Sequence, residues 1–246
     1  MRKYVRSPWK IGVFLLVFLI AFFLRAQETI SHNFLFLMDM GRDMMAVKSI
    51  VFDHHLTLIG PYTSLGGVFQ GPLWYYLLAI PTVLTKGDPW GTIVLMLIIS
   101  LSTAVVAFLW MKKLFGYNAA IITFFLISIS PEAIAAATYS WNPHPMWLLL
   151  TIYVFLLYEI KKGKQRYHLF LWPVVALLFH FEAALGFFIL LATIFYTVLF
   201  ARKSTQTKYF LLAVLLAGLF FLPQIIFDLR HNFLMTKSVV SPVQWR

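Results

Sequence analysis

Long apolar runs separated by short polar segments make up most of this chain. A helix that crosses a bilayer needs roughly 20 apolar residues, and the first run reaches that length with its flanks. No small-residue cleavage site follows it, so we interpret it as an uncleaved first span and not as a signal peptide. Seven such runs occur, at residues 11–24, 90–110, 117–138, 145–160, 167–179, 183–200 and 209–227. The pattern predicts an all-α integral membrane protein with about seven transmembrane helices.

Residues 26–89, between the first two runs, do not fit the membrane-spanning pattern. They contain an apolar stretch at 73–84 that is short, includes Pro81 and is bracketed by glycine and proline. We expect this stretch to lie on the membrane as an interfacial helix, with Trp74, Tyr75 and Tyr76 at the level of the lipid headgroups. Residues 26–89 then form a long first extracytoplasmic loop that contains interfacial helices.

The distribution of lysine and arginine predicts the orientation. With seven spans, 13 of the 20 basic residues fall on one side, in the N-terminal segment and at residues 112–113, 161–166 and 202–208. Because short basic segments mark the cytoplasmic side, the N-terminus is predicted to be cytoplasmic, and most acids and histidines extracytoplasmic. If residues 73–84 crossed the membrane as well, every later loop would change sides and the basic clusters would be divided between the two faces.

Composition narrows the class of protein further. Apolar residues make up 61% and charged residues 12%, and the 25 Phe and 8 Trp exceed what a soluble chain of 246 residues could bury. The formal net charge of +11 would suggest nucleic acid in a soluble protein, but the basic residues here lie between apolar runs. We therefore expect no nucleic-acid partner. The absence of cysteine excludes disulfides and thiolate chemistry.

The first outer loop opens with Asp39 and Asp43, four residues apart, with Arg42 between them. In a helix this spacing puts both carboxylates on one face, where like charges repel unless a cation compensates them or one pKa rises. Such an arrangement is typical of a functional site. The alternative is a solvated, acidic first turn of a surface helix.

Later segments bring further polar side chains to the same predicted face, and these are Asn142, His180, Glu182, Asp228, Arg230 and His231. Each segment has a structural alternative. Asn142 suits a helix start beside a proline, and the segment 180–182 could be a simple turn between two apolar runs. The segment 228–231 could be a solvated flank of the last run. Asp53, His54 and His55 could ligate a divalent metal, but adjacent residues cannot all point at one ion from a regular helix.

The order of these features resembles the GT-C glycosyltransferases. A first span is followed by a long outer loop that opens with Asp39 and Asp43, then by Gly-Pro-Leu-Trp-Tyr-Tyr-Leu-Leu at 71–78, and later by Ser130 and Pro131 near an outer helix end. Within that superfamily the chain is similar to the branch that holds the protein O-mannosyltransferases and the lipid A aminoarabinose transferase. The resemblance covers residues 1–246 as a single transmembrane module.

The resemblance implies an inverting enzyme that takes a sugar from a polyisoprenyl-phosphate donor on the extracytoplasmic face and passes it to a lipid, glycan or protein acceptor. Such a transfer needs a base for the acceptor proton and positive charge for the lipid phosphate, and no cofactor. Asp39 is the predicted base, with Asp43 as the other catalytic candidate. The predicted substrate-binding residues are Arg42, His54, His55, Pro72, Tyr75, Asn142, His180, Glu182, Asp228, Arg230 and His231, of which Arg42, His180, Arg230 and His231 suit phosphate.

Two features depart from the family pattern. Family members often have adjacent acids where this chain has Asp39 and then Asp43, which leaves the identity of the base open. They also often have His-Pro-Pro or Lys-Pro-Pro where this chain has Gln-Gly-Pro at 70–72, which removes a side chain that could meet the donor. Most members continue past the seventh span, so we expect a chain that ends at Arg246 to be a fragment or a split form.

Two other classes of protein remain open. A polytopic transporter would place ionisable residues near the bilayer midplane, where this chain is almost wholly apolar. A non-catalytic subunit of a split glycosyltransferase would share all the features described above. For the enzyme hypothesis we expect a multi-pass protein of the cell (plasma) membrane, in contact with membrane lipids and with its active site outside.

Overall fold

The computed structural model describes residues 8–201 and 207–240, and within these ranges the secondary structure is helical. A 3₁₀ turn, η1 (Gln165–Tyr167), precedes α8, and a π-helical turn, η2 (Thr197–Ala201), follows α9. The α-helices are α1 (Pro8–Ser31), α2 (Met38–Val51), α3 (Leu73–Leu84), α4 (Trp90–Phe115), α5 (Tyr117–Ile129), α6 (Pro131–Ala135), α7 (Met146–Lys161), α8 (His168–Leu178), α9 (Ala183–Tyr196), α10 (Thr207–Arg230) and α11 (Leu234–Val240). The predicted all-α class is confirmed for the described part of the chain. The basic residues at 2–6 and 202–203, on which the predicted orientation partly depends, lie outside it.

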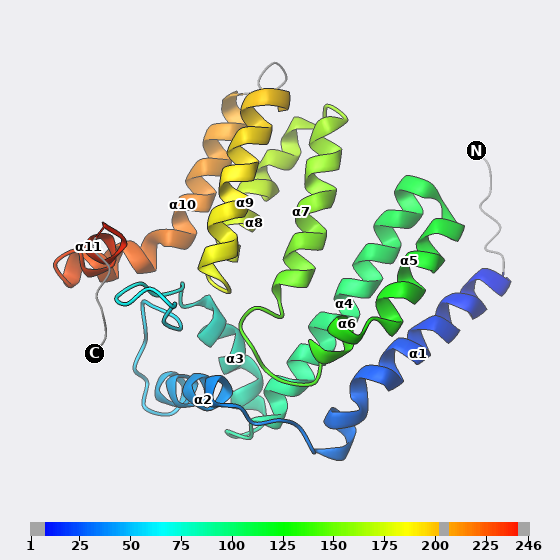
Figure 1. The fold of residues 1–246 in the computed structure, drawn as a ribbon, viewed down its shortest axis with the longest axis horizontal. Coiled ribbons are helices and arrows are strands. Elements are labelled where there is room, and N and C mark those ends of the chain that lie inside the picture. The colour runs from blue at the N-terminus through cyan, green and yellow to red at the C-terminus, as the bar shows by residue number, and fades with distance from the viewer. Residues whose placement is uncertain (1–7, 202–206, 241–246) are drawn as a thin grey trace.

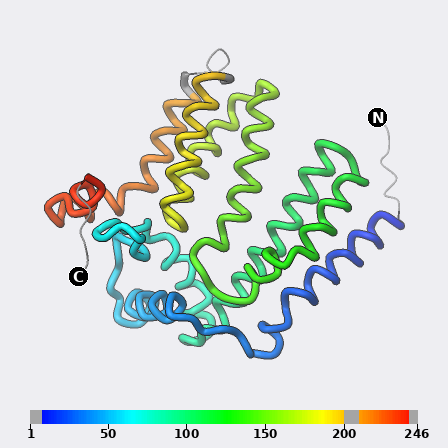
Figure 2. The backbone as a smooth tube through the Cα atoms, in the orientation of Figure 1, coloured from blue at the N-terminus to red at the C-terminus, as the bar shows by residue number. Residues whose placement is uncertain are grey.

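The long helices form two groups (Figure 1). In one group α1, α4 and α5 pack together, in the other α7 packs on α8 and α8 on α9 and α10, and contacts between α4 and α7 join the two. The helices α2 and α3 and the non-helical segment 52–72 lie together at one end of the molecule, as the backbone trace in Figure 2 shows. We call this the loop end. The opposite end, where Lys113 and Lys164 both contact Glu159, is called the lysine end.

Among the described residues, three helices are long and apolar enough to cross a membrane, namely α1, α4 and α10. The other predicted spans form shorter helices. The run at 117–138 is broken, because Ser130 has extended backbone dihedrals and Pro131 begins a new helix, α6, whose Ala133 amide donates to the Ser130 hydroxyl. The structure therefore supports a membrane protein, while the number of seven spans stays a prediction.

The helix α3 forms over the predicted residues, but its aromatic side chains do not lie among lipid headgroups. Trp74 is fully buried and Tyr75 almost so. Both pack in one core cluster with Val47 and Ile50 of α2. The expected headgroup position of these two residues is wrong, because α2 covers the face of α3 from which they project.

Sequence reasoning also missed Arg25, which lies in the first span and is fully buried. Its guanidinium donates to the Ser100 hydroxyl at 3.0 Å and to the Ser128 and Ile127 carbonyls at 2.8 and 2.7 Å. The last two carbonyls belong to the end of α5, where the helix breaks and its carbonyls lack intrahelical partners. Arg25 thus joins α1 and α4 to the broken end of α5.

Candidate active site

The predicted acidic pair lies on α2. Because the chain is helical from Met38, Asp39, Arg42 and Asp43 share one face, as their spacing indicated. Arg42 lies between the two carboxylates. Its Nη1 is 2.9 Å from Asp39 Oδ1, and its Nε donates to Asp43 Oδ1 at 2.8 Å. Of the ways of balancing the two negative charges that the sequence left open, an ion pair of each carboxylate with Arg42 is the one that the structure contains.

The two carboxylates differ in their surroundings. The Asp43 side chain is 1% exposed, and its Oδ2 accepts a hydrogen bond of 2.7 Å from Trp74 Nε1. Burial raises the pKa of Asp43, against the opposing effects of Trp74 and Arg42, and burial also raises the pKa of the neighbouring Tyr75. The Asp39 side chain is 46% exposed. Of the pair, Asp39 alone is open to a substrate.

An aromatic ring from the segment after α2 covers Arg42. The Tyr62 ring centroid lies 5.2 Å from the Arg42 guanidinium carbon. Tyr62 pairs with Phe69 in an isolated β-bridge, and the Gly60 amide donates to the Gln70 carbonyl at 2.8 Å. These contacts fold residues 60–70 into what we call the Tyr62 hairpin, which our sequence interpretation did not predict.

The end of α10 and the short helix α11 hold the Tyr62 hairpin in place. Gln224 Nε2 donates to the Phe69 carbonyl at 3.1 Å, and the Phe69 ring meets Phe227 edge to face at 5.6 Å. At the turn of the hairpin Gly67 has φ +79°, and a Cβ there would lie 2.1 Å from Ser238 Oγ of α11. Helix α11 therefore packs directly on the turn, where only glycine fits.

The three polar residues predicted at the end of the last run have different roles in the fold. Asp228 accepts hydrogen bonds from the Met235 amide at 2.7 Å and from the Thr236 hydroxyl, so that it caps α11. His231 stacks on Phe227, with ring centroids 4.0 Å apart. Arg230 is exposed and has no ion-pair partner within the described ranges.

His180 is buried and joins the start of α3 to α10. Its Nε2 lies 3.0 Å from the Phe220 carbonyl and its Nδ1 accepts from the Leu73 amide at 3.2 Å, which assigns the proton to Nε2. Burial lowers the pKa of His180. A Cβ at Gly71 would lie 2.1 Å from Nδ1 of this ring, which explains why the chain has glycine where the family pattern has proline.

Asn142 and Pro72 belong to the same packed region. Asn142 Nδ2 donates to Gln70 Oε1 at 3.1 Å and to the Phe181 carbonyl, and Pro72 is buried at the start of α3. Glu182, which precedes α9, is half-buried, and its carboxylate makes no hydrogen bond to a described residue. Contact of His180, Asn142, Pro72 or Glu182 with a substrate stays a prediction.

The histidines after α2 are exposed. His54 has φ +58°, and Nδ1 of His55 lies 3.5 Å from the Ser49 hydroxyl. Within residues 8–201 and 207–240, no three His, Asp or Glu side chains come together as metal ligands would. Substrate contact by His54 and His55 stays a prediction.

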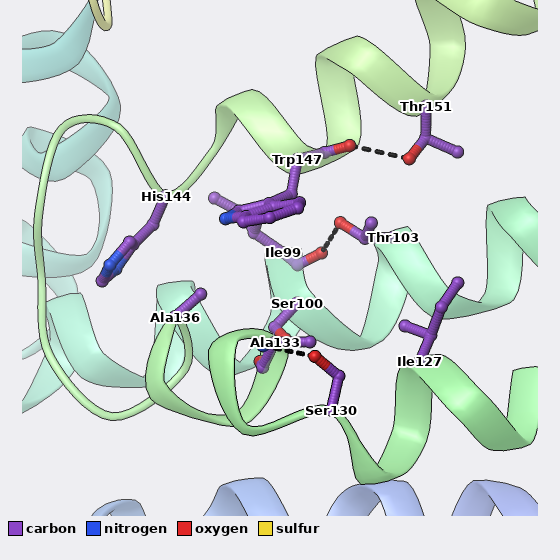
Figure 3. A pocket seen from close by; sticks show the side chains of 10 residues that line it. All are labelled: Ile99, Ser100, Thr103, Ile127, Ser130, Ala133, Ala136, His144, Trp147 and Thr151. Atoms are coloured by element: carbon purple, nitrogen blue, oxygen red, sulfur yellow. Dashed lines mark hydrogen bonds between the residues drawn. The ribbon is translucent and has the colours of Figure 1, made fainter.

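Two of the grooves that adjoin the loop end concern the candidate site. The α4–α7 groove, of about 280 Å³, lies between α4, the α5–α6 break and α7, and Figure 3 shows its lining, with His144 at one end and Thr151 at the other. The α2–α10 groove, of about 440 Å³, is lined by Ala46 and Ser49 of α2, by the segment 55–59, and by Phe227 and His231. Ala46 follows Arg42 by one helical turn, so this groove continues the face of α2 that carries the acidic pair.

The chain matches the model of the family described as dolichyl-phosphate-mannose-protein mannosyltransferase, over residues 70–227. The match agrees with the resemblance to the GT-C glycosyltransferases and does not select a branch among them. It begins within the Tyr62 hairpin and ends at Phe227, so that α2 lies before the matched region. Comparisons with curated proteins and with solved structures found no match.

Proposed function

This chain belongs to the dolichyl-phosphate-mannose-protein mannosyltransferase family, and we propose that it moves a sugar from a polyisoprenyl-phosphate donor to an acceptor hydroxyl. The family implies a membrane glycosyltransferase, and the apolar helices fit a membrane protein. We further propose that the loop end is extracytoplasmic, in the cell membrane. The support is the gathering of lysines at the opposite end, since basic residues favour the cytoplasmic side.

The observation that carries the proposal is the contrast between the two acids on α2. Asp43 is buried, accepts hydrogen bonds from Trp74 and Arg42, and holds the guanidinium. Asp39 shares that guanidinium from an exposed position. A general base must reach the proton that it removes, so we assign this role to Asp39 and a positioning role to Asp43.

The donor phosphate needs a cation that is not already neutralised. Arg42 is shared by two carboxylates, whereas Arg230 is exposed and has no partner among the described residues. We therefore assign the phosphate to Arg230. The next residue, His231, lines the α2–α10 groove, which has no Asp, Glu, Lys or Arg among its lining residues. An uncharged groove with hydroxyl, imidazole and phenyl groups suits the sugar that is attached to that phosphate.

The proposed reaction is a single displacement that needs no cofactor. The acceptor oxygen forms a bond to the anomeric carbon of the sugar while its proton passes to Asp39. The bond from that carbon to the phosphate oxygen breaks, and its electron pair leaves with the polyisoprenyl phosphate. Because attack and departure occur on opposite sides of the carbon, the configuration of the sugar inverts.

The test is transfer from a labelled polyisoprenyl-phosphate sugar by the purified protein. Asp39→Asn keeps the size and hydrogen-bonding capacity of the side chain but cannot accept a proton, so turnover should fall by roughly 10² to 10⁴. Donor binding should remain. Asp53→Asn is the matched control, because Asp53 is an exposed acid in the same loop, and it should leave turnover unchanged.

Two results would contradict the assignment. Near-normal transfer by Asp39→Asn would remove the proposed base. Tight donor binding by the wild type without either transfer or donor hydrolysis would identify a non-catalytic subunit of a split glycosyltransferase.

A further inference from the structure

The α4–α7 groove extends from the loop end into the middle of a candidate span. On α4 it is lined by Ile99 and Thr103, and Thr103 lies 13 residues after the start of the helix, which is about 20 Å along its axis. On α7 it begins beside His144 and continues through Trp147 to Thr151. Such a depth lies within the roughly 30 Å hydrocarbon layer that α4 would cross.

The groove is lined by hydroxyl groups that are already hydrogen-bonded within the protein. Thr103 and Thr151 donate to the carbonyls four residues earlier in their own helices, at 2.9 and 2.7 Å. Ser100 donates to the Ala133 carbonyl at 2.8 Å and accepts from the buried Arg25 at 3.0 Å. Because these groups have their partners, what the groove offers a ligand is its methyl, methylene and indole surface, which favours a hydrocarbon chain.

One end of the groove approaches the proposed base. His144 lines the groove, its Nδ1 lies 3.0 Å from the Tyr139 carbonyl, and the His144 and Tyr139 rings are 4.6 Å apart. Burial, and to a smaller extent the charge of Asp39, raises the pKa of Tyr139, and burial lowers the pKa of His144 to about 4. Both rings are therefore uncharged at neutral pH.

The groove is separate from the proposed donor site, as a displacement reaction requires. In Figure 1, α11 and the end of α10 lie at one side of the loop end, and α6 and the ends of α4 and α7 lie toward the other. The proposed function places the donor phosphate at Arg230, at the end of α10. An incoming hydroxyl must then attack the anomeric carbon on the face opposite the phosphate, and the α4–α7 groove is lined by helices other than α10.

We propose that the α4–α7 groove binds the hydrocarbon chain of a lipid-linked acceptor and thereby brings its headgroup hydroxyl to Asp39. This inference rests on the proposed function and adds to it the class of acceptor. A soluble peptide acceptor would have no use for a groove at this depth.

The first experiment detects binding without catalysis. The protein in dioleoyl-phosphatidylglycerol nanodiscs is photolabelled with hexadecyl glucoside that carries a diazirine on its chain. Labelling is expected at Trp147 and Thr151, to saturate, and to be displaced by unlabelled hexadecyl glucoside but not by polyisoprenyl phosphate. Thr151→Trp should fill the groove and lower the affinity for the probe about tenfold. This is the loss expected when roughly two methylene groups of the chain are excluded from the groove.

The matched control is Val154→Trp, which adds the same indole to α7 at an exposed position outside the groove. It should leave the labelling unchanged. Displacement of the probe by polyisoprenyl phosphate would overturn the proposal by assigning the groove to the donor chain. Labelling spread evenly over the exposed apolar face of α9 would also overturn it, because the probe would then report bulk lipid.

The second experiment measures transfer. Hexadecyl glucoside should be a better acceptor than methyl glucoside for the wild type, and Thr151→Trp should remove this preference while donor hydrolysis by water continues. Equal transfer to both glucosides by the wild type would contradict the inference. If the donor is neither hydrolysed nor transferred, the proposed function fails, and photolabelling still decides whether the groove binds a chain.

Discussion

The two ends of the molecule each bury one carboxylate against cations, and they do so with opposite balances of charge. At the loop end two carboxylates share one guanidinium, with Asp43 1% exposed and Asp39 46% exposed. At the lysine end Glu159 is 1% exposed and contacts both Lys113, at 2.9 Å, and Lys164. The loop-end cluster therefore has one carboxylate more than it has cations, and the lysine-end cluster has one ammonium group more than it has carboxylates.

The difference separates a cluster that only holds helices together from one that can also take part in chemistry. Glu159 joins α7 to the end of α4 and to the turn before α8, and each of its oxygens has an ammonium partner. Asp43 likewise joins two helices at the loop end, since it lies on α2 and accepts a hydrogen bond from Trp74 of α3. Asp39 adds little to packing there, because its one ion pair is exposed and such pairs contribute little stability.

The largest expected effect follows from removing the buried acid of the loop end. Asp43→Ala leaves the fully buried Trp74 indole without its acceptor and leaves the half-buried Arg42 with the exposed Asp39 alone, so the free energy of unfolding should fall by about 3 to 5 kcal/mol. Thermal unfolding in detergent measures this. Asp39→Ala, as the control, should change stability by less than about 1 kcal/mol. Equal losses for the two variants would contradict the assignment of a structural role to Asp43 and of a catalytic role to Asp39.

A smaller effect is expected at the lysine end. In Glu159→Ala both lysine side chains, 50% and 44% exposed, can turn back to water, so the loss should be about 1 to 3 kcal/mol. Sugar transfer per folded molecule should not change. If Glu159→Ala slowed transfer without lowering the melting temperature, the lysine end would have a catalytic role, and the contrast between the two ends would be wrong.

The alternation of apolar and polar segments was enough to predict the helical class and the position of most helices. The boundary of the run at 117–138 was wrong because the single charge of Glu132, beside the break at Ser130 and Pro131, does not interrupt the mean hydropathy of the run. The pattern also could not show that α2 would cover Trp74 and Tyr75, since an aromatic surface suits either lipid or protein. Arg25 directly follows the first apolar run in the sequence, and only the fold shows that it binds the end of α5.

At the candidate site, residues that are close in sequence were predicted well and residues brought together by the fold were not. The spacing of Asp39, Arg42 and Asp43 fixed their common face once the segment was helical. Which acid would be buried depended on Trp74, 31 residues later. Tyr62 was missed altogether, because its position over Arg42 depends on a hairpin that α10 and α11 hold. A glycine at the tip of that loop, Gly67, was the one available signal.

Disturbing that hairpin should sharpen the contrast between the two ends. Gly67→Ala adds a Cβ that meets Ser238 of α11 at a residue with φ +79°, and the backbone strain alone is about 1 to 2 kcal/mol. Gly163→Ala is the matched control, since Gly163 has φ +86° near the lysine end and no atom within 4 Å of an added Cβ. Gly67→Ala should lose more stability than the control and should also slow transfer. Equal effects of the two variants would show that α11 does not position the hairpin.

The smallest expected effect comes from the ring that covers Arg42, and it tests whether the loop end needs a positioned guanidinium or only a nearby charge. At the lysine end Lys113 also lies over a ring, that of Phe155, at 4.8 Å, but Phe155 is buried in the core. Tyr62 is 61% exposed, so its ring stabilises the loop end mainly by its cation–π interaction with Arg42, which is worth about 0.5 to 1 kcal/mol. Tyr62→Ala should therefore lower turnover by about two- to fivefold, with a smaller change in melting temperature than Asp43→Ala. Tyr62→Phe keeps the ring face and should restore turnover. The separate values of kcat and KM distinguish positioning from packing, because a guanidinium that has lost its ring no longer holds Asp39 in place. We therefore expect kcat to fall in Tyr62→Ala with the KM for the donor unchanged, and to return in Tyr62→Phe. A fall in turnover that only follows the loss in melting temperature would make Tyr62 a packing residue of the hairpin.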